Sequence, residues 1–165
     1  MSAVEQNNAP EHQVIVSLGS NIDPENNLRQ ALQALRTQLR VLAVSSVWET
    51  KPVTGHGPNY LNAAASIGTQ LDAGELKETI LRRIEDKLGR IRGADNHAPR
   101  TIDLDIVLFD DDVIDPHLFD YAHLAVPVAE IIAGKATSTS GEPIAVIAAR
   151  LAKQPGVKRA EMRLD

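Results

Sequence analysis

The 165-residue chain has no cysteine, and this absence excludes disulfides, thiolate chemistry and cysteine-ligated zinc. We therefore expect a reducing, cytoplasmic location. Aromatic residues make up only 3% of the chain, so few side chains could stack on a flat ligand. The net charge of −5 shows none of the basic excess typical of nucleic-acid binders. No apolar run approaches the length needed to span a membrane, so we expect neither a nucleic-acid nor a membrane partner.

What is present is the composition of one ordinary globular domain, with 43% hydrophobic and 24% charged residues. The length suits one domain better than two. The first residues are polar and lack the order of a signal peptide, so we predict a flexible tail over 1–12. We assign 13–165 to a single domain and expect a monomer.

Hydrophobic periodicity and turn residues predict the order of the elements. We expect strands over 14–18, 41–49, 60–70 and 101–109, helices over 24–40 and 72–88, and a final set consisting of a short strand at 113–114 and helices over 128–133 and 143–152. The tail from 157 is either an edge strand or disordered. The order β-α-β-β-α-β is the ferredoxin-like plan, so we predict an α+β fold. It has an antiparallel sheet, helices packed on it and C-terminal additions.

The strand 101–109 carries two carboxylates, Asp103 and Asp105, two residues apart and hence on one face. Simple alternation places Val107 and Phe109 on that face and Ile102, Leu104, Ile106 and Leu108 on the other. Magnesium prefers oxygen ligands, and two such carboxylates can bridge two ions that clamp a polyphosphate. The alternative is a solvated strand face, but close like charges repel and aspartate is a poor strand former. The metal interpretation is therefore favoured.

Arginines surround the loop that leads into this strand. Arg90, Arg92 and Arg100 flank the loop, and Arg82 and Arg83 precede it on the predicted helix. A guanidinium group can donate two parallel hydrogen bonds to a phosphate, and it stays charged at all ordinary pH values. The alternative is that these arginines are solvated or interact with the end of a helix. Function is favoured for Arg100, which follows a proline and adjoins the strand, whereas Arg90 and Arg92 are evenly balanced.

A third group, Tyr60 and Asn62, shares one face of the 60–70 strand. Tyr60 could stack on a heterocycle, and the Asn62 amide could both donate to it and accept from it. On residues alone, a core tyrosine and a turn-flanking asparagine are the better interpretation. The familiar nucleotide motifs, a Walker loop and G-x-G-x-x-G, are absent, so any ATP site is of another kind.

These pieces together resemble the 6-hydroxymethyl-7,8-dihydropterin pyrophosphokinase family of folate biosynthesis. The resemblance covers about residues 14–133. The most specific run is Pro99-Arg100-Thr101-Ile102-Asp103-Leu104-Asp105-Ile106, and the other matching runs are Gly19-Ser20-Asn21, Thr50 to Pro52, Tyr60 to Ala64, Ile84-Glu85 and Gly89-Arg90.

The resemblance implies a ferredoxin-like fold, two Mg²⁺ ions and transfer of diphosphate from ATP to the pterin hydroxymethyl group, with release of AMP. It implies that Asp103 and Asp105 are metal ligands and that Arg90, Arg100 and Asp105 are catalytic. The implied pterin-binding residues are Thr50, Val53, Tyr60, Asn62 and His123. The implied ATP-binding residues are Arg82, Glu85, Arg90, Arg92, His97, Arg100, Ile106 and Tyr121.

The chain also departs from the family pattern. His97 stands where members usually have tryptophan, and the connection before Val126 is several residues shorter. By spacing, Tyr121 then replaces an arginine and His123 an aromatic residue, while His117 could replace a histidine. Three hypotheses follow: an active enzyme, a pterin- or nucleotide-binding paralogue with lost or altered activity, and an interaction module without a substrate. The retained acids and arginines favour the active enzyme. Because the shortened connection before Val126 changes the lid of the pocket, an altered pterin substrate is a related possibility.

Overall fold

The computed structural model describes residues 10–93, 99–132 and 136–164. His97 therefore lies outside the described residues. In chain order the elements are β1 (His12–Ser20), α1 (Pro24–Gln38), β2 (Arg40–Val44), β3 (Trp48–Thr50), β4 (Tyr60–Thr69), α2 (Ala73–Leu76), the π-helical turn η1 (Lys77–Leu81), α3 (Arg82–Lys87), β5 (Asp103–Phe109), β6 (Asp112–Val113), α4 (Ala122–Ile132), α5 (Ile144–Leu151) and β7 (Lys158–Arg159).

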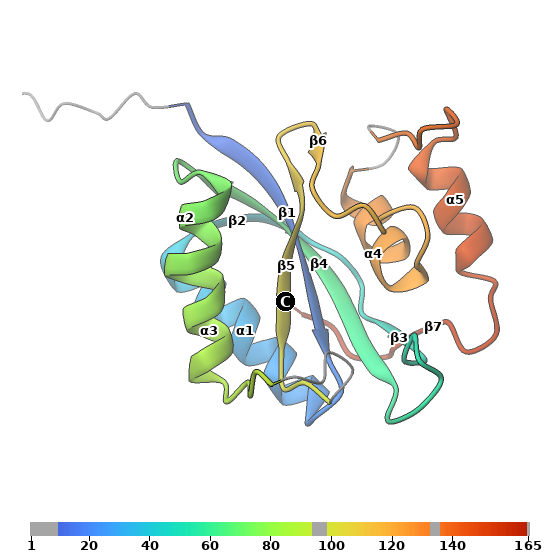
Figure 1. Ribbon diagram of the computed structural model, residues 1–165, viewed down its shortest axis with the longest axis horizontal. Helices are drawn as coiled ribbons and strands as arrows, with labels where there is room; N and C mark the ends of the chain where they lie inside the picture. The colour runs from blue at the N-terminus through green and yellow to red at the C-terminus, as the bar shows by residue number, and fades with distance from the viewer. Residues whose placement is uncertain (1–9, 94–98, 133–135, 165) are drawn as a thin grey trace, which may run out of the picture.

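The strands form one sheet in the order β6-β5-β1-β4-β3-β7, with β2 also paired to β4. Every neighbouring pair is antiparallel. The core order β5-β1-β4-β2/β3, with α1 and α2–α3 as connections, is the ferredoxin-like arrangement. The predicted α+β fold is confirmed. Figure 1 shows α1, α2 and α3 on one side of β1 and β5, and α4 and α5 on the other.

Alternate residues of β1 separate the two sides of the sheet. Val14, Val16 and Leu18 are buried in a cluster with side chains of α1 and α3. Ile15, between them, belongs to a second cluster with residues of α4. Helix α4 covers only part of its face, and the uncovered part, over the ends of β1, β4 and β5, holds the candidate site. Within the described residues, no helix is long and apolar enough to cross a membrane.

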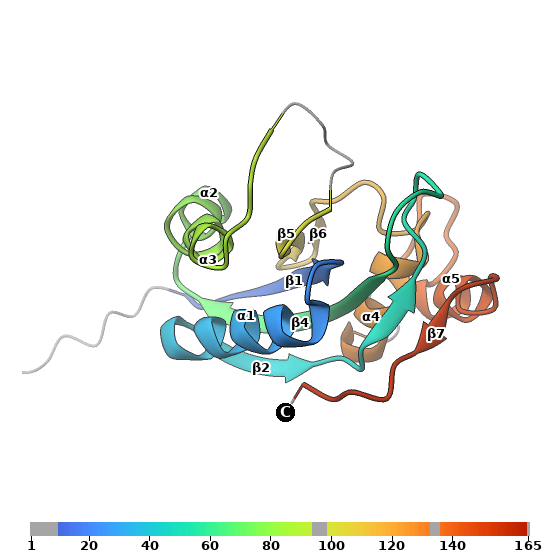
Figure 2. The same ribbon diagram turned by 90° about the horizontal axis from the view of Figure 1, so that it is seen from below.

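The strand predicted over 41–49 is two strands, and that prediction was wrong in its continuity. At the break, the Ser45 hydroxyl accepts a hydrogen bond from the Ala64 N–H at 2.8 Å. The Ser46 N–H donates to the Glu130 carboxylate of α4 at 2.8 Å. Side-chain acceptors thus pair these two N–H groups, while the Ser45 N–H still donates to the Ala64 carbonyl at 2.9 Å. The tail contributes β7, which runs beside β3 at the sheet edge (Figure 2).

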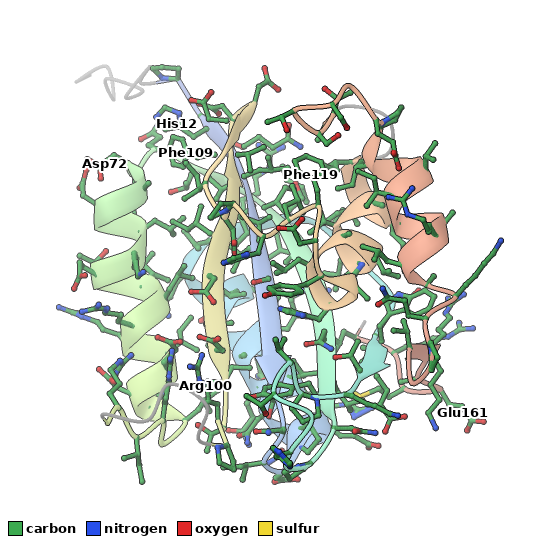
Figure 3. All side chains as sticks on the ribbon, turned by 45° about the vertical axis from the view of Figure 1, so that its right-hand side comes forward. His12, Asp72, Arg100, Phe109, Phe119 and Glu161 are labelled. Atoms are coloured by element: carbon green, nitrogen blue, oxygen red, sulfur yellow. The ribbon has the colours of Figure 1, made fainter. Side chains whose placement is uncertain are left out.

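A β-bulge in β5 breaks the predicted alternation. Ile15 pairs with Leu108 but Val16 pairs with Ile106, so Val107 is an extra residue. Val107 and Leu108 both pack in the α4 cluster. Phe109 instead packs on the α1 side. Figure 3 shows Phe109 and Phe119 on opposite sides of β5. The predicted facing of Leu108 and Phe109 was wrong, since one inserted residue reverses every later side chain.

The helices also differ from the simple periodic prediction. The helix predicted over 72–88 contains the π turn η1, which adds a residue and turns Leu81 and Glu85 inward. Gly89, at φ +84°, ends it in the left-handed conformation expected of a terminal glycine. Helix α4 starts at Ala122, six residues before the predicted start at 128, and contains Pro127.

Candidate active site

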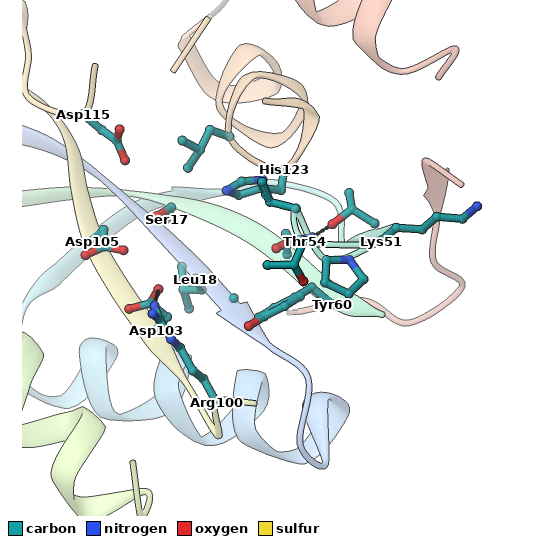
Figure 4. Close-up of a pocket in the computed structure, with 16 residues that line it drawn as sticks. Ser17, Leu18, Lys51, Thr54, Tyr60, Arg100, Asp103, Asp105, Asp115 and His123 are labelled. Carbon is teal, nitrogen blue, oxygen red and sulfur yellow. Dashed lines mark hydrogen bonds and ion pairs between the residues drawn. The ribbon is translucent and has the colours of Figure 1, made fainter. Parts of the chain in front are cut away.

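A pocket opens on the face of the sheet that α4 leaves uncovered. Its floor comes from β1, one wall from β5 and the opposite wall from the loop after β3 (Figure 4). We call it the acidic pocket. Its lining includes Ser17, Gly19, Thr50, Lys51, Val53, Tyr60, Asn62, Arg100, Asp103, Asp105, Asp115 and His123.

The carboxylates of Asp103 and Asp105 project from β5 into the pocket, as the spacing predicts (Figure 4). Leu104, between them, is 2% exposed and anchors the strand in the core. Burial, followed by the negative charges of Asp103 and Glu85, raises the pKa of Asp105 to about 7. The pocket therefore concentrates negative potential at Asp105, where a cation would relieve it.

Two arginines hold Asp103. Arg90 donates to its Oδ1 at 2.9 Å and Arg100 to its Oδ2 at 2.6 Å. The loop carrying Arg100 is fixed against β1, because the Arg100 N–H donates to Asn21 Oδ1 at 2.7 Å. Asn21 is part of the Gly19-Ser20-Asn21 turn, so this turn positions the entry to β5. The side chains of Arg90 and Arg100 are 16% and 25% exposed, which makes these ion pairs stronger than surface pairs.

The buried carboxylate of Glu85 binds two of these arginines. It is 3% exposed, and its carboxylate accepts hydrogen bonds from Arg90, from Arg92 Nη2 at 2.8 Å and from the Leu104 N–H at 3.1 Å. The π turn aims this carboxylate inward from the helix. Glu85 thus links α3 to β5 and holds two guanidinium groups beside the acids.

The predicted pterin-side residues form the other end of the pocket. The Asn62 amide, 3% exposed, donates to Thr50 Oγ1 at 2.9 Å and to the Trp48 carbonyl at 3.2 Å. These bonds fix the amide and leave its oxygen facing Gly19. Burial raises the pKa of Tyr60, whose phenol therefore stays protonated at neutral pH. Val53 is 63% exposed at the rim.

Three rings lie in series beside α4. His117 and Tyr121 have ring centroids 5.1 Å apart, and Tyr121 stacks on His123 at 5.4 Å. Only His123 lines the acidic pocket. Burial lowers the pKa of His123, although Asp115 and Asp103 oppose the shift, so the imidazole is neutral at pH 7. His123 thus occupies a pocket wall, as its position predicts, and Tyr121 supports it.

A second hollow adjoins the acidic pocket and shares Arg100 and Asp105 with it. We call it the arginine groove. It brings together five of the residues predicted to bind ATP: Arg82, Glu85, Arg90, Arg92 and Arg100. Ile106 is instead 8% exposed within the core cluster, and Tyr121 lines neither hollow. The structure therefore assembles the predicted cationic residues and separates these two from them.

Three residues that line the acidic pocket were not predicted from the sequence. Asp115, Ser17 and Lys51 line the acidic pocket although no role was assigned to them. Lys51 had a signal, because it lies in a run that matches the family. Asp115 had no signal in the sequence, since its placement depends on the bulge in β5. The amino group of Lys51 points away from the acids in Figure 4.

The donor set suits magnesium. Two carboxylate side chains adjoin across one residue of β5, in an environment that disfavours negative charge without a cation. In the described part of the chain, no group of three or more His, Cys, Asp or Glu side chains is arranged to hold a metal. The remaining ligands would thus be water and phosphate oxygens, as magnesium prefers. Asp103 and Asp105 would hold such ions.

The fold and the pocket define a class of enzyme in which acids and arginines converge on a phosphate-bearing substrate. Comparison with known proteins gives the family. Residues 15–133 match the model of the 7,8-dihydro-6-hydroxymethylpterin-pyrophosphokinase (HPPK) family. The chain belongs to this family.

Individual relatives agree. The chain is 39% identical to 2-amino-4-hydroxy-6-hydroxymethyldihydropteridine pyrophosphokinase of Bacillus subtilis over 128 residues, which are 70% of this chain and 75% of that protein. It is 40% identical to the enzyme of the same name from Pseudomonas putida over 103 residues, 61% and 84% of the two chains. The predicted family, pyrophosphokinase activity and place in folate biosynthesis are thereby confirmed.

A solved structure supports the fold. The Plasmodium falciparum HPPK-DHPS wild type with pteroate aligns with a TM-score of 0.72 at 10% identity. The alignment covers 91% of this chain and 48% of that one, so the chain spans about half the length of that structure.

Proposed function

We propose that the acidic pocket holds 6-hydroxymethyl-7,8-dihydropterin and that the arginine groove holds ATP with two magnesium ions. The observation that carries this proposal is the junction of the two hollows at Asp105 and Arg100. A pterin hydroxyl in one hollow and a polyphosphate in the other would meet there.

Each end of the pocket then has a task. The Asn62 amide and the Thr50 hydroxyl recognise the pterin edge, and the rings of Tyr60 and His123 contact its faces. Asp103 and Asp105 hold the metal ions, which would neutralise charge on the polyphosphate. Arg90 and Arg100 now neutralise Asp103 and could bind phosphate oxygens instead if a cation neutralised that carboxylate. Positioning and charge neutralisation thus supply most of the catalysis.

The test is AMP release from ATP, magnesium and 6-hydroxymethyl-7,8-dihydropterin by the wild type and by Asp103→Ala. We expect pterin-dependent AMP from the wild type and a loss of at least about 100-fold in the variant, the size seen when one electrostatic stabiliser is removed. Asp112→Ala, on the exposed strand β6, is the matched control and should keep full activity. A wild type that binds the pterin but releases no AMP would instead favour a binding paralogue.

Two further expectations stay predictions: a monomeric state and a cytoplasmic location. Sedimentation at micromolar concentration tests the first, and fractionation of the producing cell tests the second.

A further inference from the structure

The bulge in β5 places a third carboxylate, that of Asp115, in the acidic pocket. The Val107 carbonyl, at the bulge, accepts hydrogen bonds from both the Ile114 N–H at 2.8 Å and the Asp115 N–H at 3.2 Å. This double contact pins the chain after β6 against β5. Bulges commonly re-aim side chains beside active sites. The backbone therefore holds Asp115 at the pocket wall, and its position does not depend on a flexible side chain alone.

One oxygen of this carboxylate is engaged and the other is available. Asp115 Oδ1 accepts from the His117 N–H at 2.9 Å, which closes the turn into α4. Over the described ranges, Oδ2 has no hydrogen-bond partner, and no lysine or arginine pairs with Asp115. Asp103, by contrast, is bound by two arginines. Asp115 thus offers an acceptor that the protein itself does not use.

The position of Asp115 in the pocket indicates which part of a bound substrate it would contact. In Figure 4, Asp115 lies beyond Asp105 as seen from Asp103, across the pocket from Tyr60. In the complex proposed above, a pterin whose ring edge is held at Thr50 and Asn62 would extend its C6 side chain toward Asp103 and Asp105, which line the same pocket. A single hydroxymethyl group ends there. A longer polar side chain would continue past these two acids toward Asp115.

We propose that Asp115 is a specificity-determining residue that accepts a hydrogen bond from a second hydroxyl of the substrate side chain. The pocket would then take dihydropterins whose C6 side chain carries more than one hydroxyl, in addition to the hydroxymethyl compound. This inference rests on the proposed function. A hydroxyl donating to a charged carboxylate makes one of the stronger hydrogen bonds in proteins.

The transfer itself is the same for either side chain. The side-chain oxygen next to the ring forms a bond to the β-phosphorus of ATP. The bond from that phosphorus to the oxygen shared with the α-phosphate breaks, and AMP leaves with that oxygen. The hydroxyl proton passes to water. Asp115 takes no part in these bonds, and it acts only on the neighbouring hydroxyl.

The experiment compares Asp115→Asn with wild type on two probes, 6-hydroxymethyl-7,8-dihydropterin and 7,8-dihydroneopterin, which carries the longer hydroxylated side chain. The asparagine oxygen can still accept from His117, so the turn is kept while the free acceptor becomes a donor. Asp120→Asn, an acid of the same turn with a 66% exposed side chain, is the matched control. Pterin dissociation constants and AMP release are measured for all three proteins.

We expect Asp115→Asn to weaken dihydroneopterin binding at least about tenfold, as for loss of a hydrogen bond to a charged group. Binding of the hydroxymethyl compound should change less than about twofold, and Asp120→Asn should alter neither. Equal losses for both probes, no loss for either, or a wild type that does not bind dihydroneopterin would overturn the inference. If the binding difference appears but the wild type releases no AMP with either probe, the proposed function fails and the role of Asp115 stands.

Discussion

At the scale of single residues, Gly19 shows how tightly the pocket floor is built. A Cβ at this position would lie 3.3 Å from Asn62 Oδ1 and 3.8 Å from Tyr60 Cδ1. Gly19→Ala should therefore press on the Asn62 amide, for which we propose a role in pterin recognition, and raise KM for the pterin about tenfold, equivalent to about 1.4 kcal/mol. Steady-state kinetics with each substrate varied in turn measures the effect.

The matched control is Gly74→Ala in α2, where the added Cβ would make only an ordinary 3.4 Å contact with Asp72. We expect its kinetics to equal those of the wild type. A Gly19→Ala enzyme with an unchanged KM for the pterin would remove Asn62 and Tyr60 from the pterin site.

His123 should make stability depend on pH. Burial lowers its pKa in the folded protein below the ordinary value of 6.5. As pH falls through 6.5, the unfolded chain takes up a proton that the folded chain refuses. Stability is therefore full above about pH 6.5 and is lost as pH falls toward the folded pKa.

The measurement is urea unfolding of wild type and His123→Phe at pH 7.5 and 5.5. The free energy of unfolding of the wild type should fall relative to that of the variant at the lower pH. His117→Phe, whose ring is 57% exposed, should follow the wild type. A constant difference between wild type and His123→Phe would show that the ring is not buried in solution.

At the scale of elements, Glu130 joins α4 to the β2–β3 break. Its Oε1 accepts from Trp48 Nε1 at 2.6 Å and its Oε2 from the Ser46 N–H at 2.8 Å. Glu130→Gln replaces one acceptor with an NH₂ group facing a donor. Because both hydrogen bonds are exposed to solvent, we expect a loss of about 0.5–1.5 kcal/mol in the free energy of unfolding, measured by urea titration. Glu142→Gln, which removes an exposed pair with Arg150, should cost less than about 1 kcal/mol.

The same scale shows how far the sequence predicts the fold. Regular periodicity identified α1, β4 and the polar start of β5, because each follows one period without interruption. It missed the β2–β3 break, whose cause is a carboxylate 84 residues away in the chain. It missed the π turn and the bulge at Val107, since both are one-residue insertions that only tertiary packing selects.

These irregularities also explain what was missed in the site. Asp103, Asp105 and Arg100 could be predicted from the residues because they lie on or beside one clear strand, whereas Arg90 was predicted only through the family resemblance. Glu85 was predicted beside the nucleotide, but its burial follows from the π turn. Asp115 was missed because its position depends on the Val107 carbonyl. Local sequence thus identifies which side chains can act in the site, whereas one-residue insertions in the helix and the strand determine where those side chains point.

At the scale of the whole molecule, the end of the chain closes the core. Leu164 is 7% exposed and joins the cluster beneath α1 and α3. Leu164→Ala should therefore lower the free energy of unfolding by about 2–4 kcal/mol. Val146→Ala, at a 53% exposed position on α5, should leave it within about 0.5 kcal/mol. Urea titrations of the two variants beside the wild type make the comparison, and equal stabilities would show that the end of the chain is loose.

The central position of β1 has a consequence for how the protein is made. Gly19 pairs with Asn62 on one side and with Asp103 on the other. The second partner is synthesised 84 residues later, which takes roughly 4–17 s at about 5–20 residues per second. During that interval the nascent chain holds a hydrophobic strand with an open edge. Strand β1 is thus fully enclosed only after β5 has been made, and during this interval its open edge is exposed to association with other chains.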